Sequence, residues 1–113
     1  MKRMALPLLL LCALALAAHP PRSLELNYDA EKAELTVKIA HRVNDPERHF
    51  IARIEVALGK ELLAEKAFER QENAEGQEQV FLLRERPLAP GEEVVVTAAC
   101  NISGKRSARL KRD

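Results

Sequence analysis

Five side chains of this sequence belong to the types that bind soft or borderline transition metals. Three are histidines and two are cysteines: His19, His41, His49, Cys12 and Cys100. His41 and His49 flank one short polar connection, and Cys100 ends a valine-rich segment. Neutral imidazole nitrogens and a thiolate are donors that suit iron, zinc and copper. So few histidines support no serine–histidine–aspartate arrangement, and the chain has no glycine-rich phosphate loop, so hydrolysis and nucleotide binding are not indicated.

The first 18 residues have the layout of a secretory signal peptide. A basic start, Met1–Arg3, precedes an apolar run that ends at Ala18 and is shorter than the roughly 20 residues that a membrane-spanning helix needs. A permanent N-terminal anchor is the alternative. Small residues favour cleavage after Ala17, and cleavage one residue later would make His19 the first residue of the mature chain. We therefore expect a periplasmic or secreted protein with no stable membrane span after cleavage.

Cleavage would change both the charge and the cysteine count. The full chain has 113 residues with a formal net charge of +1, and removal of Lys2 and Arg3 would turn that charge to −1. So small a charge disfavours nucleic-acid binding, and the length predicts a single domain over residues 23–113. Cys12 would leave with the signal peptide. Cys100 would then be alone, so it is expected to be inert and buried, paired with another chain, or bound to a metal.

Apolar and polar residues alternate along most of the remaining chain. The alternating apolar positions are Leu24, Leu26 and Tyr28; then Leu35, Val37 and Ile39; then Phe50, Ala52, Ile54, Val56 and Leu58. A period of two is typical of a half-buried strand. Further strands are expected over 62–68, 80–83, 93–100 and 107–111, with a polar loop over 71–79. The helix-forming composition of 62–75 is the competing prediction.

Short strands at regular spacing are typical of a β-sandwich. We therefore predict an all-β fold, a single Ig-like antiparallel β-sandwich of about seven strands that follows the signal peptide. In such a fold the functional side chains are expected on the loops at the ends of the strands. Both His41 and His49 lie at predicted strand ends, and so does Cys100.

Two motifs resemble the ferrous iron-binding domain of the superoxide reductase family (neelaredoxin and desulfoferrodoxin). The first runs from His41 to Val56 and contains the sequence PERHFI, followed by IEV. The second runs from Cys100 to Gly104 and is similar to the family's Cys-Asn-x-His-Gly. The resemblance covers roughly Val37 to Gly104, and it implies an Ig-like sandwich.

The resemblance also implies a mononuclear non-haem iron site. His41, His49 and Cys100 match iron ligands of the family, and His19 is a second-rank candidate. Ser103 stands where the family has a further histidine, so the ligand set is incomplete. Fe²⁺ in such a site reduces superoxide to hydrogen peroxide. The expected partners are therefore superoxide or a small redox partner, and family members often associate into homo-oligomers.

Two other hypotheses remain open. The chain could be a non-enzymatic Ig-like periplasmic binding module, similar to the small partners of sulfur-oxidation carriers, that has lost the metal site. Alternatively, His19 as a free N-terminal residue could hold copper through its α-amine and its ring. Whether the protein is an enzyme depends on whether the site still binds iron.

Overall fold

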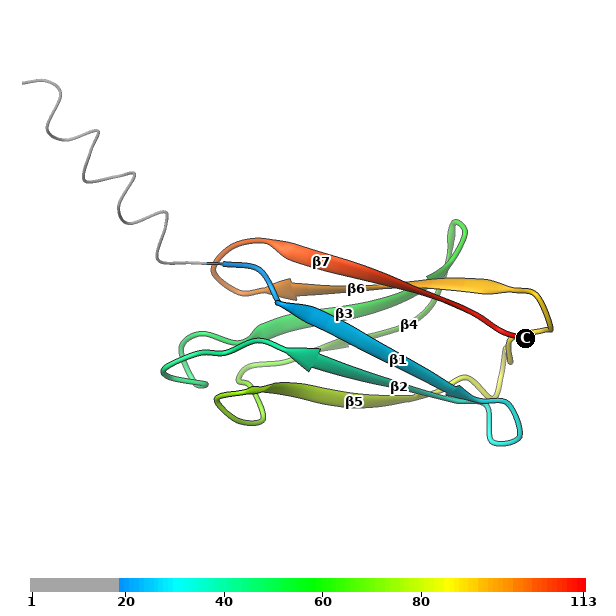
Figure 1. Cartoon of the computed structure of the whole chain (residues 1–113), viewed down its shortest axis with the longest axis horizontal. Helices are drawn as coiled ribbons and strands as arrows, with labels where there is room; N and C mark the ends of the chain where they lie inside the picture. Colours follow the sequence, from blue (N-terminus) through cyan, green and yellow to red (C-terminus); the bar gives the residue numbers. More distant parts are fainter. Residues whose placement is uncertain (1–18) are drawn as a thin grey trace, which may run out of the picture.

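The computed structural model describes residues 19–113, so the predicted signal peptide and Cys12 lie outside the described residues. Seven strands make up the described part of the chain (Figure 1). Their bounds are β1 Ser23–Asp29, β2 Glu34–Ala40, β3 Ile51–Leu58, β4 Glu61–Ala67, β5 Gly76–Leu82, β6 Glu93–Cys100 and β7 Lys105–Lys111. Within residues 19–113, no helix is long and apolar enough to cross a membrane.

The strands form two antiparallel sheets that face each other. One sheet has the order β1-β2-β5, and the other has the order β4-β3-β6-β7. β1 also contacts β7, so the two sheets meet along one side of the sandwich (Figure 1). The predicted all-β sandwich is confirmed, and the helix that competed for residues 62–75 is not formed.

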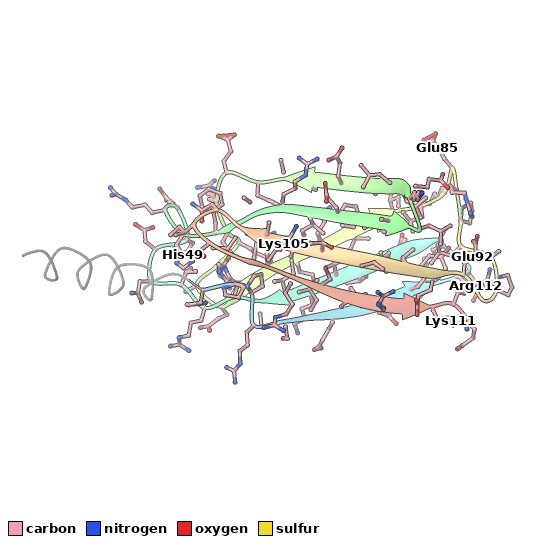
Figure 2. All side chains as sticks on the ribbon, turned by 90° about the horizontal axis from the view of Figure 1, so that it is seen from above. His49, Glu85, Glu92, Lys105, Lys111 and Arg112 are labelled. Carbon is pink, nitrogen blue, oxygen red and sulfur yellow. The ribbon has the colours of Figure 1, made fainter. Side chains whose placement is uncertain are left out.

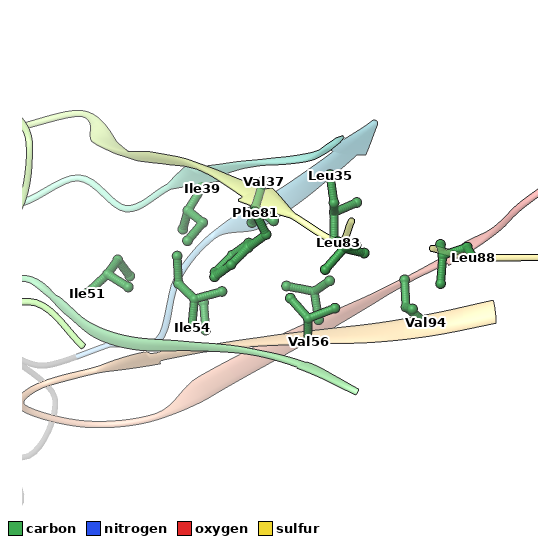
Figure 3. Packing of buried hydrophobic residues seen from close by; sticks show 12 residues of the cluster. Leu35, Val37, Ile39, Ile51, Ile54, Val56, Phe81, Leu83, Leu88 and Val94 are labelled. Atoms are coloured by element: carbon green, nitrogen blue, oxygen red, sulfur yellow. The ribbon is translucent and has the colours of Figure 1, made fainter. Parts of the chain in front are cut away.

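Apolar side chains from both sheets fill the space between them. The core consists of Leu35, Val37, Ile39, Ile51, Ile54, Val56, Phe81, Leu83, Leu88, Val94, Val96 and Ala98 (Figure 3). Alternate residues of β2 and β6 are buried, as the period of two requires. Burial of this apolar surface is the main source of stability, and it holds the strand ends in fixed positions.

The alternation predicted for the third strand is wrong at its start. Ile51 and Ile54 are both buried, although an unbroken strand would point them to opposite faces. Ile51 pairs with Cys100 and Arg53 with Ala99, so Ala52 is an extra residue in β3. This β-bulge resets the alternation, and it lies directly beside the paired residue Cys100.

The polar loop predicted over 71–79 is too long, because β5 begins at Gly76. Gly76 pairs with Ala40, and a Cβ atom on Gly76 would lie 1.9 Å from the carbonyl oxygen of Ile39. Only glycine permits this close approach of β2 and β5. The last strand also begins earlier than expected, at Lys105.

Four segments meet at one end of the sandwich. They are residues 19–22, the β2–β3 connection, the β4–β5 connection and the β6–β7 turn (Figure 1). Figure 2 shows His49 at this end and Glu92 and Arg112 at the opposite end. All the sequence-predicted ligands of the described chain belong to the first of these ends.

Candidate metal centre

The three first-rank ligand candidates converge. One potential ligand atom each of His41, His49 and Cys100 can be chosen so that all lie within 4.8 Å of one another. His41 follows the last residue of β2 and is fully buried, while Cys100 is the last residue of β6 and is also buried. His49 is half-buried and comes from the β2–β3 connection. The sandwich thus brings together residues from two different sheets.

A tight turn carries His49 back toward Cys100. The carbonyl oxygen of Asp45 accepts hydrogen bonds from the backbone N–H groups of Arg48 (3.0 Å) and His49 (2.9 Å). The Asp45 carboxylate also accepts from the N–H of Glu47 at 3.0 Å. This is the way in which an aspartate nucleates a turn. The imidazole of His49 then lies with Nε2 3.2 Å from the sulfur of Cys100.

Asn101 ties the His49 turn to the cysteine turn. Its side-chain oxygen accepts from the N–H of Phe50 at 2.8 Å, and its Nδ2 donates to the carbonyl of Arg48 at 2.9 Å. The backbone N–H of Asn101 also donates to the carbonyl of Phe50 at 2.9 Å. Both chain neighbours of His49 are therefore fixed by the residue that follows Cys100.

The cysteine turn presents a backbone donor to the sulfur. The N–H of Ile102 donates to Sγ of Cys100 at 3.4 Å, and the N–H of Cys100 bonds to the carbonyl of Gly104 at 3.0 Å. Gly104 has a φ of 81°, which favours glycine. Ser103 is exposed in the same turn.

His19, the second-rank candidate, lies beside the cluster but outside the set whose ligand atoms lie within 4.8 Å of one another. Its Nδ1 lies 3.2 Å from the carbonyl oxygen of Pro20. The centroid of its ring lies 5.7 Å from that of His41 and 5.6 Å from that of His49, and the rings of His41 and His49 are 4.8 Å apart. Three imidazoles and one thiol therefore gather at this end of the sandwich. His19 is exposed, whereas His49 is half-buried.

The segment after His19 is held by contacts with the rest of the site end. A Cβ atom on Gly104 would lie 2.8 Å from Cβ of Pro20, so the absence of a side chain there lets Pro20 pack against the cysteine turn. Nε of Arg106 donates to the carbonyl of Pro21 at 2.7 Å. The N–H of Arg22 donates to the carbonyl of Ala40, also at 2.7 Å. These contacts place His19 over the cluster.

The electrostatics of the cluster favour neutral imidazole at His49. Burial lowers the pKa of His49 below its ordinary value, and the neighbouring rings of His41 and then His19 lower it further. A positive charge on the His49 ring is unfavourable beside the other two rings. A neutral imidazole is the form that can bind a metal.

Gln71, which no sequence motif singles out, lies beside His41 in the structure. Gln71 is only 3% exposed, and its Oε1 lies 2.8 Å from Nδ1 of His41. The other ring nitrogen of His41, Nε2, is buried and has no hydrogen-bond partner. It is the only such side-chain nitrogen or oxygen among residues 19–113. Polar atoms in protein interiors are nearly always paired, so this nitrogen is free to bind a metal ion or a water molecule.

Comparisons by sequence identify no relative: no family model matches the chain, and no curated protein matches it. Solved structures do match. A variant of the superoxide reductase (neelaredoxin) from Ignicoccus hospitalis is 17% identical with a TM-score of 0.60, over 88% of this chain and 85% of that one. The fold is that of the superoxide reductases.

Two further superoxide reductase structures match the fold of this chain. The reduced form of the Archaeoglobus fulgidus neelaredoxin is 17% identical with a TM-score of 0.53, over 84% of this chain and 89% of that one. An oxidised superoxide reductase is 13% identical with a TM-score of 0.53, over 84% of this chain and 90% of that one. The expected resemblance to superoxide reductases is thus confirmed at the level of the fold. At these identities it defines the fold and not the ligands.

Proposed function

We propose that His19, His41, His49 and Cys100 bind one iron ion and that the protein is a superoxide-reductase-like iron protein. The observation that carries the proposal is the buried, unpaired Nε2 of His41 in a cluster of three imidazoles and a thiol. A bound metal would give this nitrogen the partner that the protein does not supply. The donor set of neutral imidazoles and a thiolate suits Fe²⁺.

The burial of the four side chains supports a site that is open on one side. His41 and Cys100 form a buried floor, whereas His49 is half-buried and His19 is exposed. A small anion can therefore approach from the side of His19 and His49. The lowered pKa of His49 keeps its ring neutral at neutral pH, and the N–H of Ile102 supplies a hydrogen bond to the sulfur. Such backbone donors tune the donor strength of a thiolate.

Iron in this site would supply the one-electron reduction of superoxide, which takes up one electron and two protons to give hydrogen peroxide. The electron would come from a small redox partner. The chain's own residues would hold the metal, exclude water from its buried side and leave the His19 side open. Because superoxide does not cross membranes readily, the predicted signal peptide would place the protein where external superoxide is met, in the periplasm or outside the cell.

The alternative of a non-enzymatic binding module that has lost its metal site is not favoured. A scaffold without a site has no need to keep three donor side chains together, and separated donors would have supported it. Here the donor atoms of His41, His49 and Cys100 lie within 4.8 Å. Copper held by an N-terminal amine of His19 depends on cleavage after Ala18, which lies outside the described residues.

The test is to load the purified chain with Fe²⁺ without oxygen and then expose it to superoxide. We expect one iron per chain, and we expect each superoxide consumed to give one hydrogen peroxide without release of oxygen. Release of oxygen would indicate dismutation instead. Parallel loading with Cu²⁺ and Zn²⁺ tests the choice of metal. A chain that retains no iron after anaerobic loading would overturn the proposal.

Export is tested separately. The mass of the protein recovered from the periplasm should equal that of a chain that begins at Ala18 or His19. Recovery of the uncleaved chain in the membrane fraction would support the N-terminal anchor instead.

A further inference from the structure

Gln71 is a buried amide in the β4–β5 connection, and its side chain takes part in four hydrogen bonds. Nε2 donates to the carbonyl oxygens of His41 (2.7 Å) and Asn73 (2.9 Å). Oε1 accepts from the N–H of Ile51 at 3.2 Å and lies 2.8 Å from Nδ1 of His41. One side chain thus contacts the end of β2, the start of β3 and its own loop. It touches His41 both at the ring and at the main chain.

The surroundings of Gln71 fix which end of its amide is the oxygen. Two carbonyl oxygens face Nε2, and a carbonyl can only accept a hydrogen bond. The backbone N–H of Ile51 faces the other end, and it can only donate. A flipped amide would place its N–H groups against a donor and its oxygen against two acceptors. The atom that faces the ring of His41 is therefore an acceptor.

The acceptor in turn fixes the tautomer of His41. At 2.8 Å from Oε1, Nδ1 can form a hydrogen bond only as the donor. A neutral imidazole has a single proton, so Nε2 then carries the lone pair. That lone pair is buried, lacks a partner and belongs to the residue that forms the floor of the candidate metal centre.

We propose that Gln71 is a positioning residue that holds His41 as the Nδ1–H tautomer and directs the Nε2 lone pair into the metal centre before any metal arrives. The role in metal binding rests on the proposed function, whereas the tautomer is a property of the metal-free protein. A histidine in solution exchanges between two tautomers and can rotate its ring. Fixing both in advance removes that freedom from the cost of binding.

The first experiment measures the tautomer directly in the unaltered full chain without metal. Long-range ¹H–¹⁵N correlation spectra distinguish the protonated ring nitrogen from the unprotonated one. We expect His41 to show a protonated Nδ1 and an unprotonated Nε2. A protonated Nε2 with an unprotonated Nδ1 would overturn the proposal, whether or not the chain binds iron.

Two substitutions separate the acceptor from the bulk of the side chain. Gln71→Met keeps the size but removes the acceptor, so we expect the Nε2–H tautomer of His41 to appear and the Fe²⁺ affinity to fall by about 10–100-fold. Gln71→Glu keeps an acceptor oxygen toward the His41 ring, so it should retain the Nδ1–H tautomer and weaken binding less than Gln71→Met. Its second oxygen would face the carbonyls of His41 and Asn73, so this variant is also expected to be less stable than the unaltered chain. Gln79→Met is the matched control, because the side chain of Gln79 donates only to the adjacent carbonyl of Val80.

The outcomes are distinguishable from a failure of the proposed function. If the chain shows the Nδ1–H tautomer yet binds no metal, the iron proposal fails and the action of Gln71 on His41 stands. If a folded Gln71→Met protein keeps both the tautomer and the affinity, Gln71 does not position His41. Should either variant fail to fold, the spectrum of the unaltered chain still decides the question.

Discussion

The two ends of the sandwich are both closed by polar side chains, but they treat those side chains differently. At the end opposite the candidate metal centre, Arg86 and Glu92 form a double hydrogen bond with distances of 2.9 and 2.8 Å. The N–H of Ala89 adds a bond of 2.7 Å to the same carboxylate. The hydroxyl of Tyr28 accepts from the N–H of Leu88 at 3.1 Å, and Nη1 of Arg112 donates to the carbonyl of Leu88 at 2.6 Å.

At the end that carries the histidines, one buried polar atom lacks a hydrogen-bond partner. The side chains of Asn101 and Gln71 form hydrogen bonds with the backbone, whereas Glu92 at the far end is bonded to the side chain of Arg86 and to the N–H of Ala89. The imidazoles that they support, those of His41 and His49, instead lie next to each other, and Nε2 of His41 has no hydrogen-bond partner. One scaffold thus serves two purposes: paired polar groups fix the strand ends, and unpaired polar groups are available to bind a ligand.

The largest effect that tests this contrast is expected from Cys100→Ser. Loss of the thiolate should abolish the thiolate-to-iron absorption of the oxidised protein. It should also lower the Fe²⁺ affinity by more than the about 10–100-fold that loss of a supporting residue costs. Anaerobic iron titration with absorption spectroscopy measures both. Glu92→Gln at the other end is the control and should bind iron normally. Equal loss of iron in the two variants would show that the two ends of the sandwich do not differ in metal binding.

A smaller effect is expected when a support of the site end is removed. Asn101→Ala deletes the side-chain bonds to Phe50 and Arg48, so the turn that carries His49 loses its attachment to the cysteine turn. We expect the free energy of unfolding to fall by about 1–2 kcal/mol, as for two exposed hydrogen bonds. The Fe²⁺ affinity should fall by about 10-fold. Urea unfolding and iron titration measure the two quantities, and an unchanged affinity would show that His49 needs no such support.

At the end opposite the candidate metal centre, we expect the stability of the protein to depend on pH and not on metal. Hydrogen bonds from Arg86 and then from the N–H of Ala89 lower the pKa of Glu92 to about 2. The folded state therefore favours the carboxylate, and this stabilisation is present above about pH 4.3, the ordinary pKa of a glutamate. It is lost as the pH falls toward about 2. Glu92→Gln should thus be less stable than the unaltered chain at pH 7, with a difference that disappears in acid; a difference independent of pH would contradict the pairing.

The smallest effect concerns the ionisation of His49 in the metal-free protein. Its lowered pKa means that the folded state disfavours the protonated ring. Stability is therefore full above about pH 6.5, the ordinary value for histidine, and it decreases as the pH falls below that value. His49→Gln cannot titrate and should show a weaker decrease between pH 7 and 5. Chemical unfolding at several pH values measures this, and parallel pH profiles for the two proteins would remove His49 as the cause.

Much of the fold could be predicted from the sequence because the strands are buried on one face. Leu35, Val37 and Ile39 point into the core as their alternation predicts. The bulge at Ala52 could not be predicted, because it depends on which residues of β6 lie opposite β3. The start of β5 at Gly76 was missed for a related reason. A glycine in a polar segment resembles a loop residue, whereas here it permits close contact with Ile39.

The site was predictable only in part. His41, His49 and Cys100 could be named because their motifs are local in the sequence, and the structure brings them together. The approach of His19 depends on the packing of Pro20 against Gly104, which no local pattern encodes. No pattern in the sequence identified Gln71 as a residue of the site. Its role arises from a neighbouring imidazole and two backbone groups that only the folded chain supplies.

The most direct measurement is X-ray absorption at the iron edge of the Fe²⁺-loaded chain, compared with the Cys100→Ser variant. If the cluster is the metal centre, the unaltered protein should show one sulfur ligand together with the multiple-scattering pattern of imidazoles. The sulfur contribution should vanish in the variant. Iron surrounded by oxygen alone, or a spectrum that is the same in both proteins, would contradict the account.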